Sequence, residues 1–152
     1  MMIRSSVCAM ITRNNEILTI KKQEEENAII FIMPGGGQEF GETLLEALRR
    51  EVREEVGASI KNEKLIFVRE YIGMNHENSE RDRKLHIVSH IFSCEIEEEG
   101  KYHLEPDQDQ IGMEWLKIDE LEKYNFYPRE VINELKKLNT STYTATYLGD
   151  IN

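Results

Sequence analysis

The segment PGGGQEFGETLLEALRREVREEVGA, residues 34–58, decides the fold, because it joins a glycine-rich loop to a stretch with helical periodicity. Thr43 and Glu46 have the spacing of a capping box at a helix N-terminus, and Gly57 is a typical C-terminal stop. These signals predict a helix over 43–56. The apolar residues at helical spacing that we expect to face the core are Leu45, Leu48 and Val52.

The loop before this helix resembles a phosphate-binding loop in its glycines but not in its charge. Gly36 and Gly41 have the spacing of a P-loop, yet Glu42 stands where that loop requires Lys. Glu39 and Glu42 would repel a phosphate from the helix N-terminus. Either the loop binds no phosphate, or a metal cation lies between its carboxylates and the phosphate.

Three glutamates share one face of the predicted helix. Glu54 and Glu55 follow Glu51 by three and four positions, so their side chains project within about 100° of one another. Two like charges about 6 Å apart repel by roughly 3 kcal/mol at an effective dielectric near 20, so this crowding requires a cation or a raised pKa. Oxygen ligands without sulfur favour Mg²⁺ or Mn²⁺ over zinc. The alternative is a solvated acidic face paired with the neighbouring arginines.

The glycines, glutamates and arginine of this segment resemble the Nudix box. Gly36 is followed after five residues by Glu42, and after seven more by Arg50-Glu51-Val52-Arg53-Glu54-Glu55-Val56-Gly57-Ala58. The common upstream extension is matched by Pro34, Gly35, Gly36, Glu39, Gly41 and Glu42. Ala58 alone departs from the pattern, since it is smaller than the expected bulky aliphatic residue. We expect this difference to affect local packing rather than chemistry.

The resemblance implies an α/β/α sandwich around a mixed sheet and the hydrolysis of a nucleoside diphosphate linked to another group. It further implies that Glu54 and Glu55 are metal ligands and that the Gly36 carbonyl is another. Glu51 would be a ligand or the general base. Arg50 would pair with Glu54 and hold its side chain, and Glu42 would anchor the loop. The implied cofactor is Mg²⁺, with Mn²⁺ as a substitute, and a homodimer is common among similar proteins.

Many Nudix proteins recruit a further acid from outside the box. Glu105, Asp107 and Asp109 are candidates here, and Asp109 is the preferred metal ligand among them, against the alternative of an ordinary acidic turn. The Asp107-x-Asp109 pattern does not continue as a calcium loop, because Ile118 stands where the bidentate Glu belongs.

Outside the box, apolar runs predict more strands than helices. The expected strands are 3–12, 16–22, 28–33, 64–72, 84–96, 112–118 and a tail strand at 142–148; the expected further helices are 119–124 and 128–138. Asn14-Asn15 suits a hairpin turn, and 75–83 is expected to be poorly structured. The pattern predicts an α+β sandwich rather than a doubly wound sheet, in one domain over residues 1–152.

Charge and composition exclude several partners. The chain has 29 acidic and 19 basic residues, a net charge of −10, which disfavours nucleic-acid polymers and anionic membranes. No apolar run approaches the roughly 20 residues of a transmembrane helix, and no signal peptide is evident, so we expect a cytoplasmic protein. Cys8 and Cys94 are expected to be buried thiols, and His86 and His90 lie about 13 Å apart on a strand, too far to share an ion.

The sequence therefore predicts a Mg²⁺-dependent Nudix hydrolase of a small nucleotide derivative. Two other functions fit the same fold: a nucleotide-sensing module that has lost turnover, and an isomerase of prenyl diphosphates. The intact glutamates disfavour the first. The second resembles proteins with an additional catalytic Cys and Glu, for which Cys8 and Cys94 give no clear match. No aromatic residue is singled out for stacking on a base, so the nucleotide and its linked group stay open.

Overall fold

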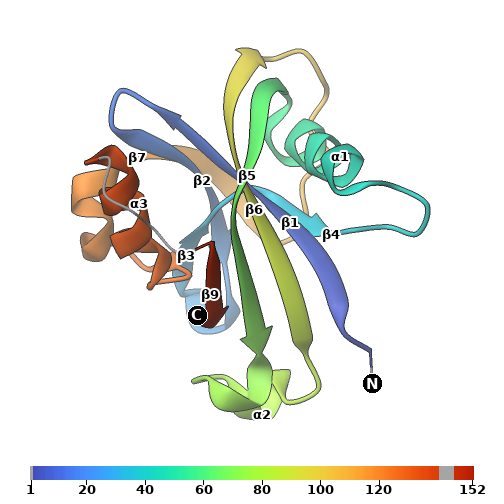
Figure 1. Ribbon diagram of the computed structural model, residues 1–152, viewed down its shortest axis with the longest axis vertical. Helices are drawn as coiled ribbons and strands as arrows, with labels where there is room; N and C mark the ends of the chain where they lie inside the picture. Colours follow the sequence, from blue (N-terminus) through green and yellow to red (C-terminus); the bar gives the residue numbers. More distant parts are fainter. Residues whose placement is uncertain (1, 141–145) are drawn as a thin grey trace.

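The computed structural model describes residues 2–140 and 146–152. It is an α/β/α sandwich around a mixed sheet (Figure 1). The strands are β1 (Arg4–Arg13), β2 (Glu16–Gln23), β3 (Ile29–Ile32), β4 (Gly35–Gly37), β5 (Ser59–Ile72), β6 (His86–Glu98), β7 (Gln110–Lys117), β8 (Phe126–Tyr127) and β9 (Tyr147–Asp150). The helices are α1 (Leu44–Val56), α2 (Ser79–Asp82) and α3 (Val131–Asn139), with 3₁₀ turns at Glu25–Asn27, Gly73–Asn75 and Ile118–Lys123.

The sheet is mixed because its central strand, β1, has neighbours of both directions. The strand order is β8-β3-β2-β1-β6-β5-β9, with β4 also pairing β1 and β7 also pairing β2. β1 runs parallel to β6 and antiparallel to both β2 and β4. The hairpin between β1 and β2 turns at Asn14 and Asn15, both at positive φ, as expected.

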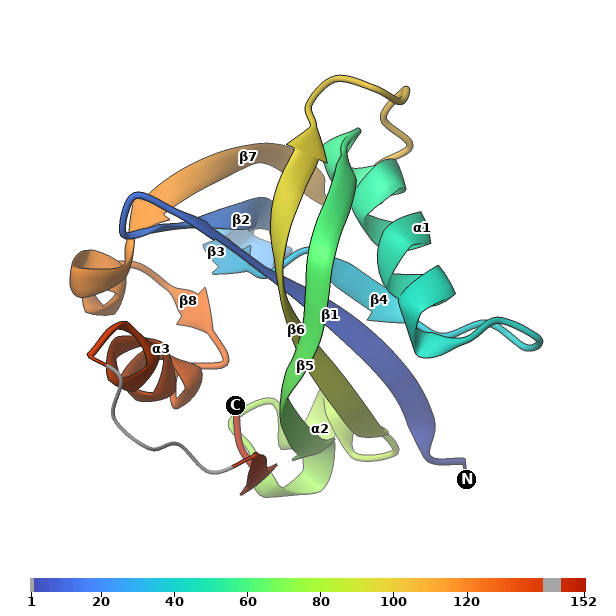
Figure 2. The same cartoon turned by 45° about the horizontal axis from the view of Figure 1, so that its top comes forward.

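Helices cover both faces of the sheet, α1 on one side and α3 on the other (Figure 2). Side chains along β1 alternate between the two layers, as they must in a strand buried on both faces. Val7 and Ile11 belong to the core under α1, whereas Met10 belongs to the core that includes Leu135 of α3. Burial on two faces explains why the inner strands are continuously apolar in sequence.

Helix α1 begins and ends where its capping residues predict. The Thr43 hydroxyl accepts a hydrogen bond from the Glu46 amide, and the Glu46 carboxylate accepts one from the Thr43 amide, which completes a capping box. Gly57 follows in the left-handed conformation at φ 72°. These caps fix the direction of α1 at both ends, and with it the direction of the glutamates that α1 carries.

Several predicted elements differ from the structure. Leu45 does not face the core but is 37% exposed, and the buried face of α1 comprises Ala47, Leu48, Val52 and Glu55. The expected loop at 75–83 contains the short helix α2, and the expected helix at 119–124 is a 3₁₀ turn. The helix expected from 128 begins at Val131. Residues 142–145 of the expected tail strand lie outside the described residues, whereas β9 follows at Tyr147.

Within the two described ranges, no helix combines the length and apolar character needed to cross a membrane.

Candidate active site

Strand β4 holds the glycine loop against β1, and its glycines are required by close contacts. Gly35 pairs with Cys8, and a Cβ at Gly35 would lie 2.1 Å from the Val7 carbonyl oxygen. A Cβ at Gly36 would lie 2.5 Å from Oε1 of Glu51. Any side chain at these positions would displace either the strand or the carboxylate. The two glycines therefore bring the loop backbone directly onto the acidic face of α1.

The rest of the loop is held by Glu42 and Arg50. Glu42 accepts a hydrogen bond from the Glu39 amide at 2.7 Å and two from the Arg50 guanidinium, at 2.7 and 3.1 Å. Arg50 also donates to the Gly37 carbonyl at 2.9 Å. These charge-assisted contacts lower the pKa of Glu42 and raise that of Arg50. Glu42 thus closes the loop upon itself and onto α1.

Arg50 also reaches the predicted metal ligands, and it pairs with Glu54 as expected. Its Nη1 donates to Oε1 of Glu51 at 2.7 Å and lies 3.5 Å from Oε2 of Glu54. The main partners of Arg50 are therefore Glu42 and Glu51, and the predicted pairing with Glu54 is the longest of its ion pairs. Arg50 balances part of the negative charge that the glutamates of α1 place together.

Glu55 is the most deeply buried acid of this group. It is 3% exposed, and its Oε2 accepts a hydrogen bond from the Gly35 amide at 2.9 Å. Burial raises its pKa to about 7, with Glu51 adding to the rise, while the Gly35 amide opposes it. Burial likewise raises the pKa of Glu51, against the opposing effect of Arg50. Burial, more than mutual repulsion, therefore makes Glu51 and Glu55 ionise reluctantly.

The raised pKa of Glu55 predicts that the metal-free protein loses stability as the pH rises. A protonated Glu55 contributes stability that is fully present below the unfolded pKa, 4.5, and is lost as the pH passes through about 7. The largest contribution this allows is about 3 kcal/mol. We expect Glu55→Gln, which keeps an acceptor for the Gly35 amide, to melt at a higher temperature than the wild type at about pH 8 in EDTA.

The measurement is the melting temperature of both proteins in EDTA from about pH 5.5 to 8. The difference between the two curves isolates Glu55, because every other titratable group is common to both proteins. We expect that difference to grow with pH. Parallel curves, or a variant less stable at every pH, would contradict the burial of Glu55.

The donor set of this cluster fits a hard divalent cation. Oε2 of Glu51, Oε1 of Glu54 and Oε1 of Glu55 accept no hydrogen bond from any described residue. The Gly36 backbone lies against Glu51, and every available donor is an oxygen, as Mg²⁺ requires. Among the described residues, no three His, Cys, Asp or Glu side chains already lie close enough together to hold an ion. The structure thus brings the donors to one place without a preformed cage.

Asp109, predicted as a ligand from outside the box, is not brought into this cluster. It pairs with Lys22 at 3.3 Å, as does Asp107. Of the two acids, Asp107 is the one whose charge raises the pKa of Glu51 and of Glu55. The loop itself does reach the helix, because the Glu105 amide donates to the Glu54 carbonyl. The charge of Asp107 therefore acts more strongly on Glu51 and Glu55 than the charge of Asp109 does.

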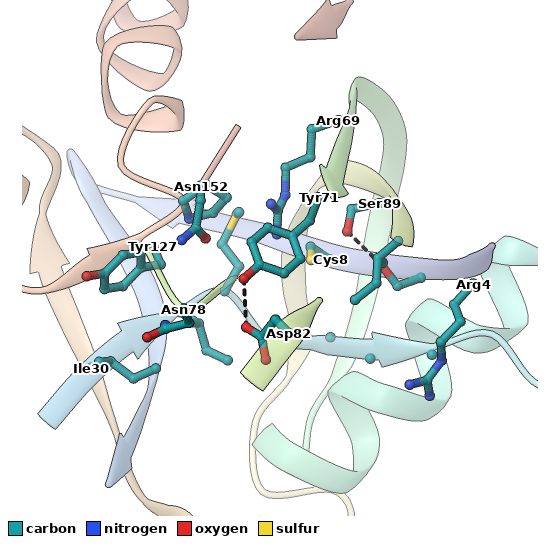
Figure 3. Close-up of a pocket in the computed structure, with 18 of the residues that line it drawn as sticks. Arg4, Cys8, Ile30, Arg69, Tyr71, Asn78, Asp82, Ser89, Tyr127 and Asn152 are labelled. Carbon is teal, nitrogen blue, oxygen red and sulfur yellow. Dashed lines mark hydrogen bonds between the residues drawn. The ribbon is translucent and has the colours of Figure 1, made fainter. Parts of the chain in front are cut away.

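A pocket of about 580 Å³ opens beside the glycine loop (Figure 3). It is lined by residues of β1 and β4, of the C-terminal half of β5 and of the N-terminal half of β6, with residues of the β8 region opposite. The lining includes Gly35, Gly36 and Gly37. Apolar side chains such as Ile30 and Met33 share it with the tyrosines Tyr71 and Tyr127. A cavity of this size and mixed lining suits a nucleotide-sized ligand.

Cysteine and histidine positions differ in part from the sequence predictions. Neither cysteine is in a disulfide; Cys94 is buried, as expected, whereas Cys8 is half-buried and lines the pocket. His86 hydrogen-bonds Glu70 and His90 hydrogen-bonds the Ser6 carbonyl, so each has a partner of its own.

Sequence reasoning missed the polar residues of the pocket wall. The Tyr71 hydroxyl donates to Asp82 at 2.7 Å, and Arg69 projects into the same space from β5. One signal could have found them: Phe67, Arg69 and Tyr71 alternate on one face of a strand, so the arginine stands at an inward position. Asp82 had no comparable signal, because α2 was expected to be irregular.

Comparison with known proteins agrees with this arrangement. The chain matches the family model described as NUDIX domain over residues 2–135. It is 29% identical to an ADP-ribose pyrophosphatase of Methanocaldococcus jannaschii over 129 residues, and the aligned region covers 85% of this chain and 70% of that protein. It is 30% identical to the nucleoside triphosphatase NudI of Salmonella agona over 131 residues, and the aligned region covers 80% of this chain and 87% of that protein.

A solved structure shows the same fold. A NUDIX hydrolase from Nitrosomonas europaea superposes with a TM-score of 0.73 at 21% identity, covering 93% of this chain and 91% of that one. The fold, the box and the family match define a hydrolase of phosphorus-containing acid anhydrides. The chain belongs to the Nudix family, as the sequence resemblance predicts.

Proposed function

We propose that this protein hydrolyses a phosphoanhydride bond of a small nucleotide derivative in a reaction that depends on Mg²⁺. The observation that carries the proposal is the meeting of the Gly36 backbone with the glutamates of α1, at the edge of a pocket that fits a nucleotide. The curated relatives support the nucleotide, since one is named an ADP-ribose pyrophosphatase and another a nucleoside triphosphatase.

In this proposal, Glu51, Glu54, Glu55 and the Gly36 carbonyl hold the metal ion. Mg²⁺ bound there would neutralise anhydride oxygens and lower the pKa of a water molecule. In the same proposal Glu51 either completes this set or takes the proton of the attacking water, because its Oε2 accepts no hydrogen bond from described residues. Asp109, which pairs with Lys22, would have to leave that ion pair in order to act as a further ligand.

Arg50 positions this machinery rather than reacting. Its contacts hold Glu42, the Gly37 carbonyl and Glu51 together, so the loop and the helix keep one relative position. The hydrogen bond from the Gly35 amide to Glu55 also ties the loop to the helix. These contacts hold the loop against α1 before any substrate arrives, and the carboxylates would still have to draw together around the added cation.

The test is a panel of ADP-ribose, sugar nucleotides, dinucleoside polyphosphates and nucleoside triphosphates, each assayed with Mg²⁺, with Mn²⁺ and with EDTA. We expect at least one substrate to be cleaved to a nucleoside monophosphate with added metal, and no cleavage in EDTA. Cleavage that persists in EDTA would contradict the metal dependence. Tight nucleotide binding without turnover in either metal would favour the sensing module instead.

A further inference from the structure

Arg69 is a cation placed inside the pocket without a carboxylate partner among the described residues. Its Nη1 donates to the Ile151 carbonyl at 2.8 Å, and its Nε is buried with no hydrogen-bond partner. Figure 3 shows the side chain pointing from β5 into the pocket, toward Cys8 and beside Tyr71. Burial lowers the pKa of the guanidinium, although the group stays charged because an arginine pKa lies far above neutral.

Two carboxylates of the pocket wall, Asp82 and Glu77, have partners other than Arg69. Asp82 accepts from Tyr71 and pairs with Arg81, and Glu77 accepts from the Tyr127 hydroxyl. None of these contacts involves Arg69. A half-buried guanidinium with an unpaired N–H is costly unless an anion or several acceptors reach it. The pocket of this acidic chain therefore contains a positive charge with no described carboxylate at ion-pair distance, although Glu130 and Asp150 act on it from farther away.

Arg69 also lies in a row of paired residues that crosses the sheet toward the glycine loop and the glutamates proposed to hold the metal. Strand pairing places Arg69 beside Ser89, Ser89 beside Ser6, and Ser6 beside Gly37, in one row across the sheet. Cys8 lies between Arg69 and the glutamates of α1, and the charges of both act on its thiol. Burial raises the pKa of that thiol to about 11; Arg69 lowers this pKa, and Glu55 and Glu51 raise it further. The backbones of Arg69 and Gly37 are about 14 Å apart across three inter-strand spacings, and the long arginine side chain shortens that gap.

We propose that Arg69 binds a second anionic group of the substrate, a phosphate next to the scissile anhydride. Its planar set of N–H donors suits a phosphate, which offers several acceptor oxygens and the compensating charge. The preferred substrates are then nucleoside triphosphates rather than nucleoside diphosphates linked to a neutral sugar. This inference rests on the proposed function, since it assigns the substrate class of the same site. The names of the curated relatives do not decide between the two classes.

The test compares substrates that differ in one phosphate. Hydrolysis of ATP and ADP, GTP and GDP, CTP and CDP, and UTP and UDP is measured for the wild type, Arg69→Gln and Arg69→Lys, with ADP-ribose and UDP-glucose as neutral-sugar substrates. For the best triphosphate, Arg69→Gln should lower kcat/KM by about 10- to 100-fold. For the matching diphosphate and the sugar nucleotides, Arg69→Gln should change kcat/KM by less than threefold. Arg69→Lys should recover part of the loss on the triphosphate.

Arg13→Gln is the matched control, because it makes the same charge change at an exposed end of β1, on a residue that does not line the pocket. It should leave both substrate classes unchanged. Circular dichroism and melting temperature check that each variant folds. Equal losses on triphosphates and diphosphates, or a wild type that prefers the neutral-sugar substrates, would overturn the inference while leaving the proposed function in place.

A binding measurement separates the two proposals if turnover is absent. Inorganic triphosphate and pyrophosphate are titrated calorimetrically into the wild type and Arg69→Gln. We expect the triphosphate to bind the wild type more tightly, and the advantage to be lost in Arg69→Gln. That result without hydrolysis of any substrate would overturn the proposed function but support anion binding by Arg69. Equal triphosphate binding by both proteins would overturn the role of Arg69, whatever the turnover.

Discussion

Replacing Glu54 with Gln is expected to lower kcat on the order of 1,000-fold, which is about 4 kcal/mol of transition-state stabilisation. The substitution keeps the size of the side chain but removes the charge that a divalent cation needs. Because Glu54 is partly exposed and makes one long ion pair with Arg50, the folded structure should tolerate the change. The measurement is the initial rate on the best substrate at saturating Mg²⁺, together with the metal concentration required for half-maximal activity.

Glu120→Gln is the control for this variant, since Glu120 makes a surface ion pair with Lys123 at 3.5 Å, far along the chain from the box. It should keep wild-type activity. A Glu54→Gln protein that retains more than about a tenth of the wild-type rate at saturating Mg²⁺ would show that Glu54 is not a ligand. A true ligand variant should also require a higher metal concentration for half-maximal activity than the wild type.

Replacing Arg50 with Gln is expected to destabilise the protein by roughly 3 kcal/mol, because it strips a cation from carboxylates that stay in place. The side chains of Arg50, Glu42 and Glu51 are only 16%, 16% and 12% exposed, so water compensates poorly for the lost contacts. Activity should fall about 10- to 100-fold, as expected for residues that orient metal ligands. The measurements are the free energy of unfolding in urea and kcat on the best substrate.

The preceding residue supplies a matched comparison. Arg49 is 57% exposed and pairs with Glu63, whose side chain is 10% exposed, so Arg49→Gln should cost less than Arg50→Gln, about 1 kcal/mol, and leave activity unchanged. Arg50→Lys keeps the charge but loses the two-pronged contact with Glu42, and should lie between the wild type and Arg50→Gln. Equal effects at positions 49 and 50 would contradict the role given to Arg50.

The box and its helix could be predicted from sequence because local chemistry determines them. The capping box at Thr43 and the left-handed Gly57 depend on neighbours within a few residues, and so do the positions of Glu51 and Glu54 on one helical face. Asn14 and Asn15 gave the hairpin for the same reason. Each of these features follows from the preferences of a short segment of backbone.

The errors lie where distant parts of the chain decide the outcome. The burial of Glu55 depends on the Gly35 amide, which β4 supplies. Its position, three residues after Val52 and seven after Leu48, places it on the buried face and was a readable sign. Leu45 looked equally apolar, but it lies off the buried face of α1 and is 37% exposed. A glycine strand such as β4 has no side-chain pattern from which to predict it.

The pocket is the least predictable part, because its walls come from segments far apart in sequence. Arg69, Asp82 and Tyr127 meet only after β5, α2 and β8 are assembled. The preference of Asp109 for Lys22 likewise follows from the pairing of β2 with β7, which no local pattern reveals. The sequence therefore indicates the chemistry of the box, whereas the folded structure is needed to infer a further phosphate on the substrate.

The central claim is that the glutamates of α1 tolerate one another because a divalent cation joins them to the substrate. A crystal soaked in Mn²⁺ and recorded at an anomalous wavelength tests it directly. We expect a single anomalous peak bounded by Glu51, Glu54, Glu55 and the Gly36 carbonyl, with Arg50 still on Glu42. A site without a peak at saturating Mn²⁺, with Glu51 still held by Arg50, would contradict the claim.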